Sequence, residues 1–178
     1  MTSDASGQRT QVRVRRARAA EGERLREIAR SSKGYWGYEA ERVADWVAGL
    51  DVSAEGLRKK EFYVAEVEGL VVGWSAIIPK REVCWLDDLW IEPDWIGKGV
   101  GTKMFRHAIA RGRELGAARI ELEAEQHAIG FYEKMGMRCV RDSEPGVWGR
   151  ISPIMAVGIV DPETRRDQRR RHRHPPGR

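Results

Sequence analysis

Glycine occupies every second position of the segment Gly97-Lys98-Gly99-Val100-Gly101, which lies between a strand-like run at 87–93 and a helix-like run at 100–115. Because glycine has no side chain, it lets backbone N–H groups approach a ligand closely. The first turn of a helix adds unpaired N–H donors and the positive end of the helix dipole. The segment therefore predicts a strand, an anion-binding loop and a helix, with a phosphate group as the usual anion.

The spacing of these glycines excludes two well-known phosphate-binding loops. It reads G-x-G-x-G in the middle of the chain, whereas the dinucleotide fingerprint reads G-x-G-x-x-G and belongs to a first strand–helix–strand unit. The Walker pattern G-x-x-x-x-G-K-[ST] cannot be laid over it either. The residues that follow the long helix have to identify the ligand.

A strand and a short helix follow the long helix. Residues 120–124 (IELEA) alternate apolar and charged side chains, as a half-buried strand does. The run from Ala128 to Met137 then predicts a short helix, with Gly136 in the position of a C-terminal cap.

Two motifs in this order resemble those of the GNAT family of acyl-CoA-dependent N-acetyltransferases, and the resemblance covers roughly residues 11–159. The first motif is carried by Leu89-Trp90-Ile91 and the IGKGVG segment 96–101, although Ile96 stands where the family usually has Gln or Arg. The second motif is matched by Ala128, Phe131, Tyr132, Glu133, Lys134 and Gly136. A subset of the family, mostly without assigned substrates, shares the IGKGVG form and two further elements, Ser32-Lys33…Trp36-Gly37-Tyr38 and Gly149-Arg150-x-x-Pro153.

The periodicity of apolar residues predicts a mixed α/β chain. Strands are expected at 11–17, 61–67, 70–79, 82–92, 118–124, 137–140 and 148–160, the last interrupted at Pro153, and helices at 21–32, 39–50, 99–116 and 128–136. The connector 51–60 has room for a short helical turn, and Glu68-Gly69 predicts a tight hairpin turn. The resemblance implies the GNAT fold, a mostly antiparallel central sheet that is flanked by helices and splayed at its two central strands.

The net charge of +5 belongs to the two ends of the chain. Residues 1–20 hold five arginines and one aspartate, and residues 161–178 hold seven arginines and three acidic residues, so the part between them is mildly acidic. This distribution argues against a nucleic-acid-binding fold, although a weak contact through the basic tail stays open. We expect a flexible N-terminus at 1–10, one GNAT domain at 11–160 and a disordered Arg-rich tail at 161–178.

The sequence predicts a cytoplasmic protein without a membrane partner. No apolar run reaches the length of a membrane-spanning helix, and the polar segment 1–9 has no secretory signal. Cys84 and Cys139 are expected to be reduced thiols, as is usual in that compartment. The resemblance leaves a homodimer open.

The resemblance implies acetyl-CoA as the cosubstrate, bound without a metal. In the family, the strand that contains 89–91 pairs with the pantetheine arm and has backbone donors near the reacting carbonyl, and the pyrophosphate lies on the amides of the loop. Lys98 either adds a positive charge there or is a solvated surface residue. The residues expected to bind the cosubstrate are Leu89, Trp90, Ile91, Gly97, Lys98, Gly99, Val100, Gly101, Thr102, Phe131 and Tyr132.

Acetyl transfer to an amine needs two proton transfers, because the amine must lose a proton and the thiolate that departs must gain one. Tyr132 matches the position of the family's general acid. The base is left open among Asp87, Asp88, Glu123 and His127. Adjacent residues of a regular strand face opposite sides, so only one of Asp87 and Asp88 is expected to face the cleft.

The acceptor cleft is expected beside the aromatic residues Tyr35, Trp36 and Tyr38, because in this fold the loop between the first two helices borders it. These rings either stack on a cationic amine or pack the helix pair against the sheet. The residues expected to contact the acceptor are Trp36, Tyr38, Asp87 and Arg150, with Ser143 nearby. Arg150 either pairs with an acceptor carboxylate or makes a structural salt bridge.

The function implied by the resemblance is an N-acetyltransferase that moves an acetyl group from acetyl-CoA to a primary amine of a small molecule or a protein, by direct attack in a ternary complex. Two alternatives stay open at this point. One is a non-catalytic acyl-CoA-binding regulatory module, and the other is an RNA- or ribosome-associated protein that acts through its basic tail.

Overall fold

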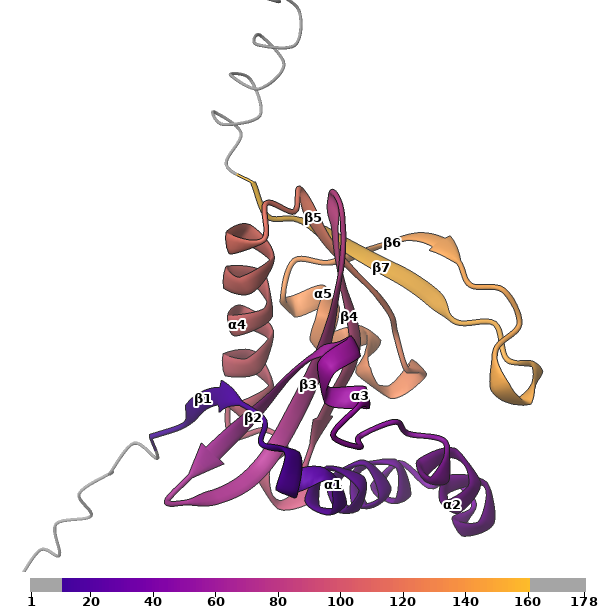
Figure 1. The fold of residues 1–178 in the computed structure, drawn as a ribbon. Helices are drawn as coiled ribbons and strands as arrows, with labels where there is room; N and C mark the ends of the chain where they lie inside the picture. The colour runs from indigo at the N-terminus through magenta and orange to yellow at the C-terminus, as the bar shows by residue number, and fades with distance from the viewer. Residues whose placement is uncertain (1–10, 161–178) are drawn as a thin grey trace, which may run out of the picture. The chain divides into compact units, whose positions relative to one another are not determined.

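The computed structural model describes residues 11–160, and the expected flexible ends at 1–10 and 161–178 lie outside the described residues. The helices and strands follow one another along the chain in the order that the sequence predicts (Figure 1). In chain order they are β1 (Arg13–Arg16), α1 (Gly22–Tyr35), α2 (Ala40–Ala48), α3 (Gly56–Lys59), β2 (Glu61–Val67), β3 (Leu70–Lys80), β4 (Val83–Ile91), α4 (Val100–Glu114), β5 (Arg119–Glu123), α5 (Ile129–Lys134), β6 (Arg138–Asp142) and β7 (Pro153–Gly158).

The strands form a seven-stranded sheet in the order β1-β2-β3-β4-β5-β7-β6. β1 with β2, β5 with β7 and β6 with β7 pair antiparallel, which gives the mostly antiparallel sheet that was predicted. β4 and β5 pair in parallel. This direction follows from α4, which connects the end of β4 to the start of β5 as a crossover.

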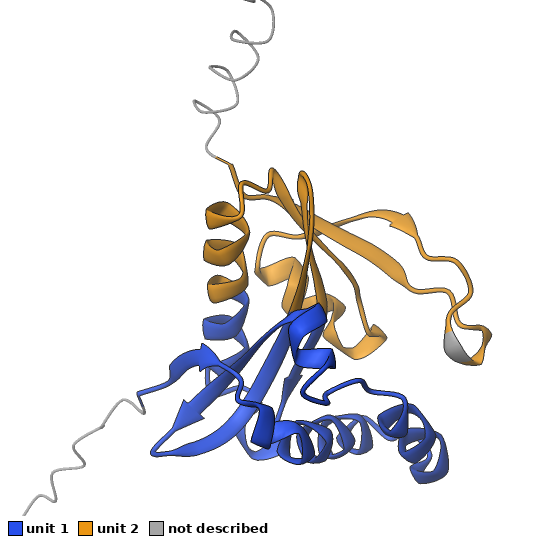
Figure 2. Ribbon diagram, viewed as in Figure 1, with its two compact units in different colours: residues 1–76, 88–105 blue, residues 77–87, 106–178 orange. Residues whose placement is uncertain are grey.

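The chain divides into two compact units (Figure 2). The first comprises residues 1–76 and 88–105, and the second comprises residues 77–87 and 106–178. The boundary between them passes through β3, β4 and α4, so these three elements belong partly to each unit.

The core of the first unit lies where α1 packs on β2 and β3. Leu25, Ile28 and Ala29 recur at helical spacing on α1 and are fully buried. The indole nitrogen of Trp74 on β3 donates a hydrogen bond of 2.8 Å to the Leu25 carbonyl oxygen, which ties the helix to the sheet. The buried cluster around this contact also contains Val52, Phe62, Val64, Ala76 and Trp90.

The hairpin between β2 and β3 turns at Glu68 and Gly69, as the sequence predicts. Both residues have positive φ angles, 50° and 83° respectively. Two successive left-handed residues match the right-handed twist of the strands they join, which is why glycine suits the second position.

The second unit is built on β5, which pairs with β4 on one side and β7 on the other. Ile120 and Leu122 point into its core, and Glu121, between them, is only 4% exposed. The Glu121 carboxylate accepts hydrogen bonds from Arg119 Nε at 2.6 Å and from Arg141 Nη2 at 2.7 Å. Burial raises the pKa of this carboxyl group, but the two guanidinium groups lower it more, so the pKa lies below its usual value.

The expected strand at 148–160 is wrong over residues 148–152. A 3-10 turn at Val147–Gly149 replaces its beginning, and β7 starts only at Pro153. Trp148 and Gly149 have φ angles of 72° and 69°, which are incompatible with an extended strand. Pro153 lacks an N–H donor and is accommodated at the first position of the strand.

Two further findings concern the expected cellular environment. Among residues 11–160, no helix combines the length and the apolar character that crossing a bilayer requires. Cys84 is buried and Cys139 is exposed, and both are free thiols, as expected from the sequence.

Gly56 at the start of α3 has no room for a side chain, because an added Cβ would collide with the carbonyl oxygen and the carboxylate of Asp51. We expect Gly56→Ala to lower the free energy of unfolding by about 1–3 kcal/mol, as overpacking does. At Gly34 in α1 an added Cβ meets nothing within 4 Å. Gly34→Ala should therefore raise the free energy of unfolding by about 0.5–1 kcal/mol in the same urea titrations. Equal effects of the two substitutions would contradict this packing.

The lowered pKa of Glu121 predicts a dependence of stability on pH. The ionised carboxylate stabilises the fold fully above its unfolded pKa of about 4.3, and this contribution is lost as the pH falls through the lower folded pKa. Glu121→Gln should thus reduce the free energy of unfolding by about 1–3 kcal/mol at pH 7, with a smaller deficit near pH 3. Glu114→Gln, which removes an exposed ion pair with Arg111, is the control and should show little effect at either pH. A deficit for Glu121→Gln that is the same at both pH values would argue against the assignment.

Candidate functional site

The loop that precedes α4 has the backbone that the glycine pattern predicts. Gly97 and Gly99 adopt left-handed φ angles of 78° and 83°. An added Cβ at either position would meet no atom within 4 Å, so glycine is favoured there by the backbone conformation and not by crowding. The space beside the loop is accordingly open to a ligand.

The first turn of α4 presents main-chain donors. The first helical hydrogen bond in this turn runs from Lys103 N to the Gly99 carbonyl oxygen at 3.0 Å. The N–H groups of Val100, Gly101 and Thr102 precede it and have no acceptor within the helix. Val100 is fully buried, so the start of the helix is anchored in the core while its donors point outward along the axis.

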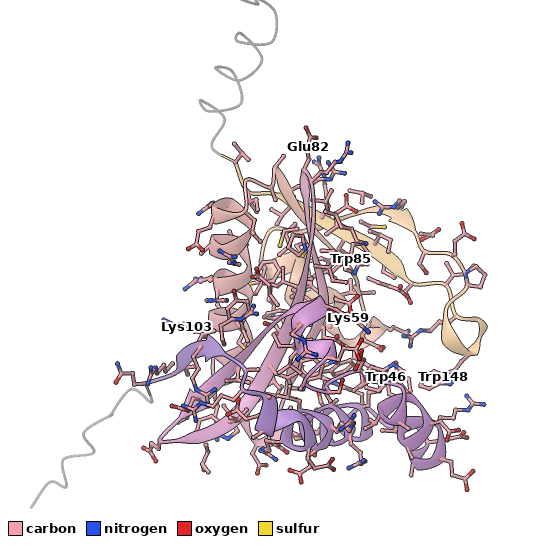
Figure 3. All side chains as sticks on the ribbon, viewed as in Figure 1. Trp46, Lys59, Glu82, Trp85, Lys103 and Trp148 are labelled. Carbon is pink, nitrogen blue, oxygen red and sulfur yellow. The ribbon has the colours of Figure 1, made fainter. Side chains whose placement is uncertain are left out.

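Two side chains near the loop complete its surroundings. Lys98 is exposed, and its ammonium nitrogen lies 5.1 Å from the centre of the Trp95 ring. Lys103, on the first turn of α4, is also exposed (Figure 3). The site at the start of α4 is therefore electropositive in its main chain and in its side chains.

The pairing of β4 with β5 stops well before β4 ends. The parallel ladder joins Val83 to Arg119, Cys84 to Ile120 and Trp85 to Glu121, whereas β4 continues to Ile91. Beyond Trp85, no register with β5 is found among the described residues. The main chain of 86–91 is therefore not paired with β5, as expected if the two central strands part there.

β4 is also irregular in the faces that its side chains occupy. The side chain of Cys84 lies against Gly112 of α4. The side chains of Ile91 and of Met104, which is also on α4, both lie next to the place that a Cβ atom on Gly73 would occupy. In a regular strand, side chains an odd number of positions apart face opposite sides. The alternation of side chains between the two faces of β4 is therefore interrupted somewhere between Cys84 and Ile91. Because Asp87 and Asp88 lie in this segment, their side chains need not face opposite sides of the sheet.

The two carboxylates have different neighbours. Asp88 is half-buried and accepts a 2.9 Å hydrogen bond from the indole nitrogen of Trp90. Asp87 is exposed and accepts a 3.1 Å hydrogen bond from the indole nitrogen of Trp85. Of the two, Asp88 is thus the carboxylate held by a buried group.

In the second unit, Tyr132 lies on α5 and is 7% exposed. Its ring packs against Phe131, with ring centres 5.1 Å apart and planes at 65°. The helix ends as predicted, because Gly136 has a φ of 86° and the Tyr132 carbonyl accepts a bond from Met137 N. A short helix with a capped C-terminus therefore fixes the position of the Tyr132 side chain.

Glu123 and His127, the other two candidates for the base, lie near α5 and are both exposed. Arg150 donates to Glu125 with an Nη2–Oε2 distance of 2.8 Å, so it makes a salt bridge within the protein. Trp148 projects from the loop between β6 and β7 and is 39% exposed (Figure 3). Ser143 accepts a hydrogen bond from Ser152 N and spans the two ends of this loop.

The aromatic residues of the α1–α2 corner separate into two groups. Tyr35 and Trp36 are 56% and 38% exposed and pack edge to face, with ring centres 4.9 Å apart. Tyr38 turns inward instead, and its ring lies 4.7 Å from the ammonium nitrogen of Lys33. Tyr38 therefore packs within the protein, and stacking of Tyr35 and Trp36 on a cationic amine stays a prediction.

The largest feature that sequence reasoning missed is the environment of Lys33. This lysine is 3% exposed and lies among Tyr38, Trp46 and Trp90. The sequence signal was the Ser32-Lys33 element, but nothing local indicates which rings surround it.

Two other observations concern a hollow in the second unit and the side chains that could bind a metal ion. A hollow of about 550 Å³ in the second unit is lined by Arg119, Glu121, Arg138 and Arg141 with residues of β7, and none of the expected site residues lines it. Among residues 11–160, no group of histidine, cysteine or acidic side chains is arranged to hold a metal ion.

Comparison with known proteins identifies the family. The model of the acetyltransferase (GNAT) family matches residues 23–137. The chain belongs to the GNAT family. It is therefore an acyltransferase, and the motifs at 96–101 and 128–136 both lie within the matched region.

Among curated relatives, peptidyl-lysine N-acetyltransferase YjaB of Escherichia coli is 27% identical over 164 residues, which cover 84% of this chain and 97% of that protein. The uncharacterized N-acetyltransferase MJ1207 of Methanocaldococcus jannaschii is 34% identical over 85 residues, which cover 42% of this chain and only 38% of that protein.

Among solved structures, the PaiA N-acetyltransferase of Thermoplasma acidophilum in complex with coenzyme A has a TM-score of 0.72 at 19% identity and covers 83% of this chain and 99% of its own. YncA of Salmonella typhimurium with acetyl-CoA has a TM-score of 0.62, at 19% identity over 85% and 96% of the two chains. These similarities establish the GNAT fold.

The loop geometry predicts that Gly99 matters to coenzyme A binding through its backbone. Gly69 is a matched control, because it has the same φ of 83° and an equally open Cβ position. Gly99→Ala and Gly69→Ala should lower the melting temperature to a similar extent, since both force alanine into a left-handed conformation. Only Gly99→Ala should weaken coenzyme A binding, by about tenfold or more in calorimetric titration. Equal affinities of the two variants would remove the loop from the binding site.

Proposed function

We propose that this protein transfers the acetyl group of acetyl-CoA to a primary amine by direct attack in a ternary complex. The observation that carries the proposal is the left-handed Gly97–Gly99 loop, which opens the first turn of α4 next to a strand whose outer edge is not used by β5. Open main-chain donors at both places fit a ligand that carries a pyrophosphate and a peptide-like arm.

The binding roles follow from these donors. The amides of Gly99, Val100, Gly101 and Thr102 would hold the pyrophosphate, where the partial positive charge of the helix end favours an anion. The Lys98 amide donates instead to the Trp95 carbonyl oxygen at 3.4 Å. The main chain of 89–91 would pair with the pantetheine arm as an added strand. Ile96, which replaces the usual polar residue, does not impair this arrangement because main-chain donors do not depend on the side chain.

Acetyl-CoA supplies an activated acyl group with a thiolate as its leaving group. Tyr132 is assigned to donate the proton that this thiolate gains, because a tyrosine fixed by a capped helix and a packed ring can be held in one orientation. Phe131 packs edge to face against that ring.

Asp88 is assigned as the group that receives the proton of the amine. A lysine-like amine has a pKa of about 10.4 and is charged at neutral pH, so a carboxylate would both attract it and take its proton, directly or through water. Asp88 is half-buried and oriented by the Trp90 indole, whereas Glu123 and His127 are exposed, which favours Asp88 over these alternatives.

The acceptor class that we favour is the side chain of a peptidyl lysine. The support is the likeness to a peptidyl-lysine acetyltransferase over most of both chains. The exposed Tyr35–Trp36 pair at the α1–α2 corner offers aromatic faces to a cationic side chain.

The proposed function is tested by release of free thiol from acetyl-CoA across a panel of acceptors. The panel contains lysine peptides with blocked N-termini, the same peptides with lysine replaced by norleucine, free amino acids and polyamines. The proposal expects thiol release above the hydrolysis rate with the lysine peptides and not with their norleucine forms. The proposal would be overturned if none of the amines in the panel caused thiol release above the hydrolysis rate.

The assignment of Tyr132 predicts a specific kinetic effect. Tyr132→Phe should lower kcat by about 10²-fold to 10⁴-fold, while the Kd of acetyl-CoA stays within a factor of about two. Tyr63→Phe is the matched control, because Tyr63 is also 7% exposed, and its hydroxyl donates a hydrogen bond to Glu61 at 2.8 Å. The control should lose some stability and keep its kcat. An unchanged kcat in Tyr132→Phe would exclude the general-acid role.

A further inference from the structure

The ammonium group of Lys33 is enclosed by aromatic rings. Its nitrogen lies 4.4 Å from the centre of the Trp46 ring, 4.7 Å from that of Tyr38 and 5.2 Å from that of Trp90. All three distances are within the range of cation–π attraction. These rings come from α2, from the α1–α2 corner and from β4, so one ammonium contacts three separate segments of the first unit.

A lysine that is 3% exposed is unusual, because burying its charge is unfavourable unless other groups compensate. Methionine or leucine would fill the same space without a charge. A buried cation at the end of α1 is therefore expected to do something that packing alone would not require.

Trp90 connects Lys33 to the carboxylate assigned as the base. Its ring packs edge to face against Trp46, with centres 5.0 Å apart, and is only 9% exposed. Its indole nitrogen donates the 2.9 Å hydrogen bond to Asp88. A cation over an indole also polarises the ring and makes its N–H a stronger donor.

β4 contains a second arrangement of the same kind, which serves as a comparison. Lys80 lies 4.7 Å from the centre of the Trp85 ring, and the Trp85 indole donates to Asp87. Lys80 and Asp87 are exposed, and Trp85 is only half-buried. Water competes with each of these contacts, so this arrangement should fix its carboxylate much less firmly.

We propose that Lys33 is a positioning residue for acetyl transfer, which acts through the Trp90 indole to hold the Asp88 carboxylate in the orientation that receives the proton of the amine. This role rests on the proposed function, because it assumes that Asp88 takes part in the reaction. It also gives the Ser32-Lys33…Tyr38 element a purpose, since the element supplies both the cation and one of its rings.

The kinetic test combines Lys33→Met with Asp88→Asn. In the otherwise unchanged enzyme, Lys33→Met should lower kcat about tenfold and leave the KM of acetyl-CoA within about twofold, and Lys33→Arg should restore most of the rate. In the Asp88→Asn background, Lys33→Met should change kcat by less than about twofold, because the group it positions is already gone. Trp90→Phe, which keeps a ring and removes the N–H, should behave like Lys33→Met in both backgrounds.

Two results would overturn the positioning role. One is a loss of kcat from Lys33→Met that is as large in the Asp88→Asn background as in the parent enzyme. The other is a fall in melting temperature with no change in kcat per folded molecule, which indicates packing alone. Lys80→Met is the control for loss of a cation–π contact and should keep its kcat; a tenfold loss there would equally contradict the proposal.

A second measurement separates this inference from the proposed function. The indole N–H signals of ¹⁵N-labelled protein report the hydrogen bond of each tryptophan without any need for activity. Lys33→Met and Asp88→Asn should both move the Trp90 indole signal, whereas Lys80→Met should move that of Trp85 and leave Trp90 unchanged. A Trp90 signal that is unaffected by Lys33→Met would refute the link, even in an enzyme that acetylates every lysine peptide. If the link is seen and no amine is acetylated, the proposed function fails and with it the catalytic purpose of the link.

Discussion

The direction of the main-chain N–H groups at the start of α4 is the constraint on which the rest of the molecule depends. A helix end carries roughly half a positive charge, and this charge is useful only if the chain leaves the end uncovered. The left-handed conformations of Gly97 and Gly99 turn the chain away from it, and the buried Val100 fixes the helix in place. In the proposed function, the binding of a diphosphate, the register of the arm that follows it and the position of the thioester would all derive from this geometry.

β4 provides the groups to which the proposed function assigns the chemistry. It leaves β5 after Trp85, so its main chain is available to a ligand, and it presents Asp88 and Trp90 on one face through their mutual hydrogen bond. Trp90 belongs at the same time to the buried cluster with Leu25 and Trp74. A single tryptophan thus joins the core of the first unit to the carboxylate at which we place the proton transfer.

Features that depend on neighbouring residues could be predicted from the sequence. The glycine loop, the Glu68-Gly69 turn, the helix cap at Gly136 and nearly all strands and helices follow from local periodicity and backbone preference. Where the last strand begins was predicted wrongly, because the left-handed Trp148 is a conformation that a bulky residue seldom adopts and that no local pattern signals.

Features that depend on contacts distant in sequence could not be predicted. The rings around Lys33 come from three segments, and the partner of Arg150 is 25 positions away on the other side of α5. The choice of base stayed open for the same reason, since it depends on where Asp87 and Asp88 point. A regular strand would separate them, but the interrupted alternation of β4 removes that inference, and burial and the Trp90 contact distinguish them instead.

The central claim is that main-chain donors hold coenzyme A, and amide hydrogen exchange measures those donors directly. The account predicts that saturating coenzyme A slows exchange at residues 99–102 and in 89–91. Pantetheine, which lacks the diphosphate, should slow exchange in 89–91 and leave 99–102 unchanged. Exchange at 99–102 that is unaffected by coenzyme A, with protection appearing instead elsewhere in the chain, would contradict the account.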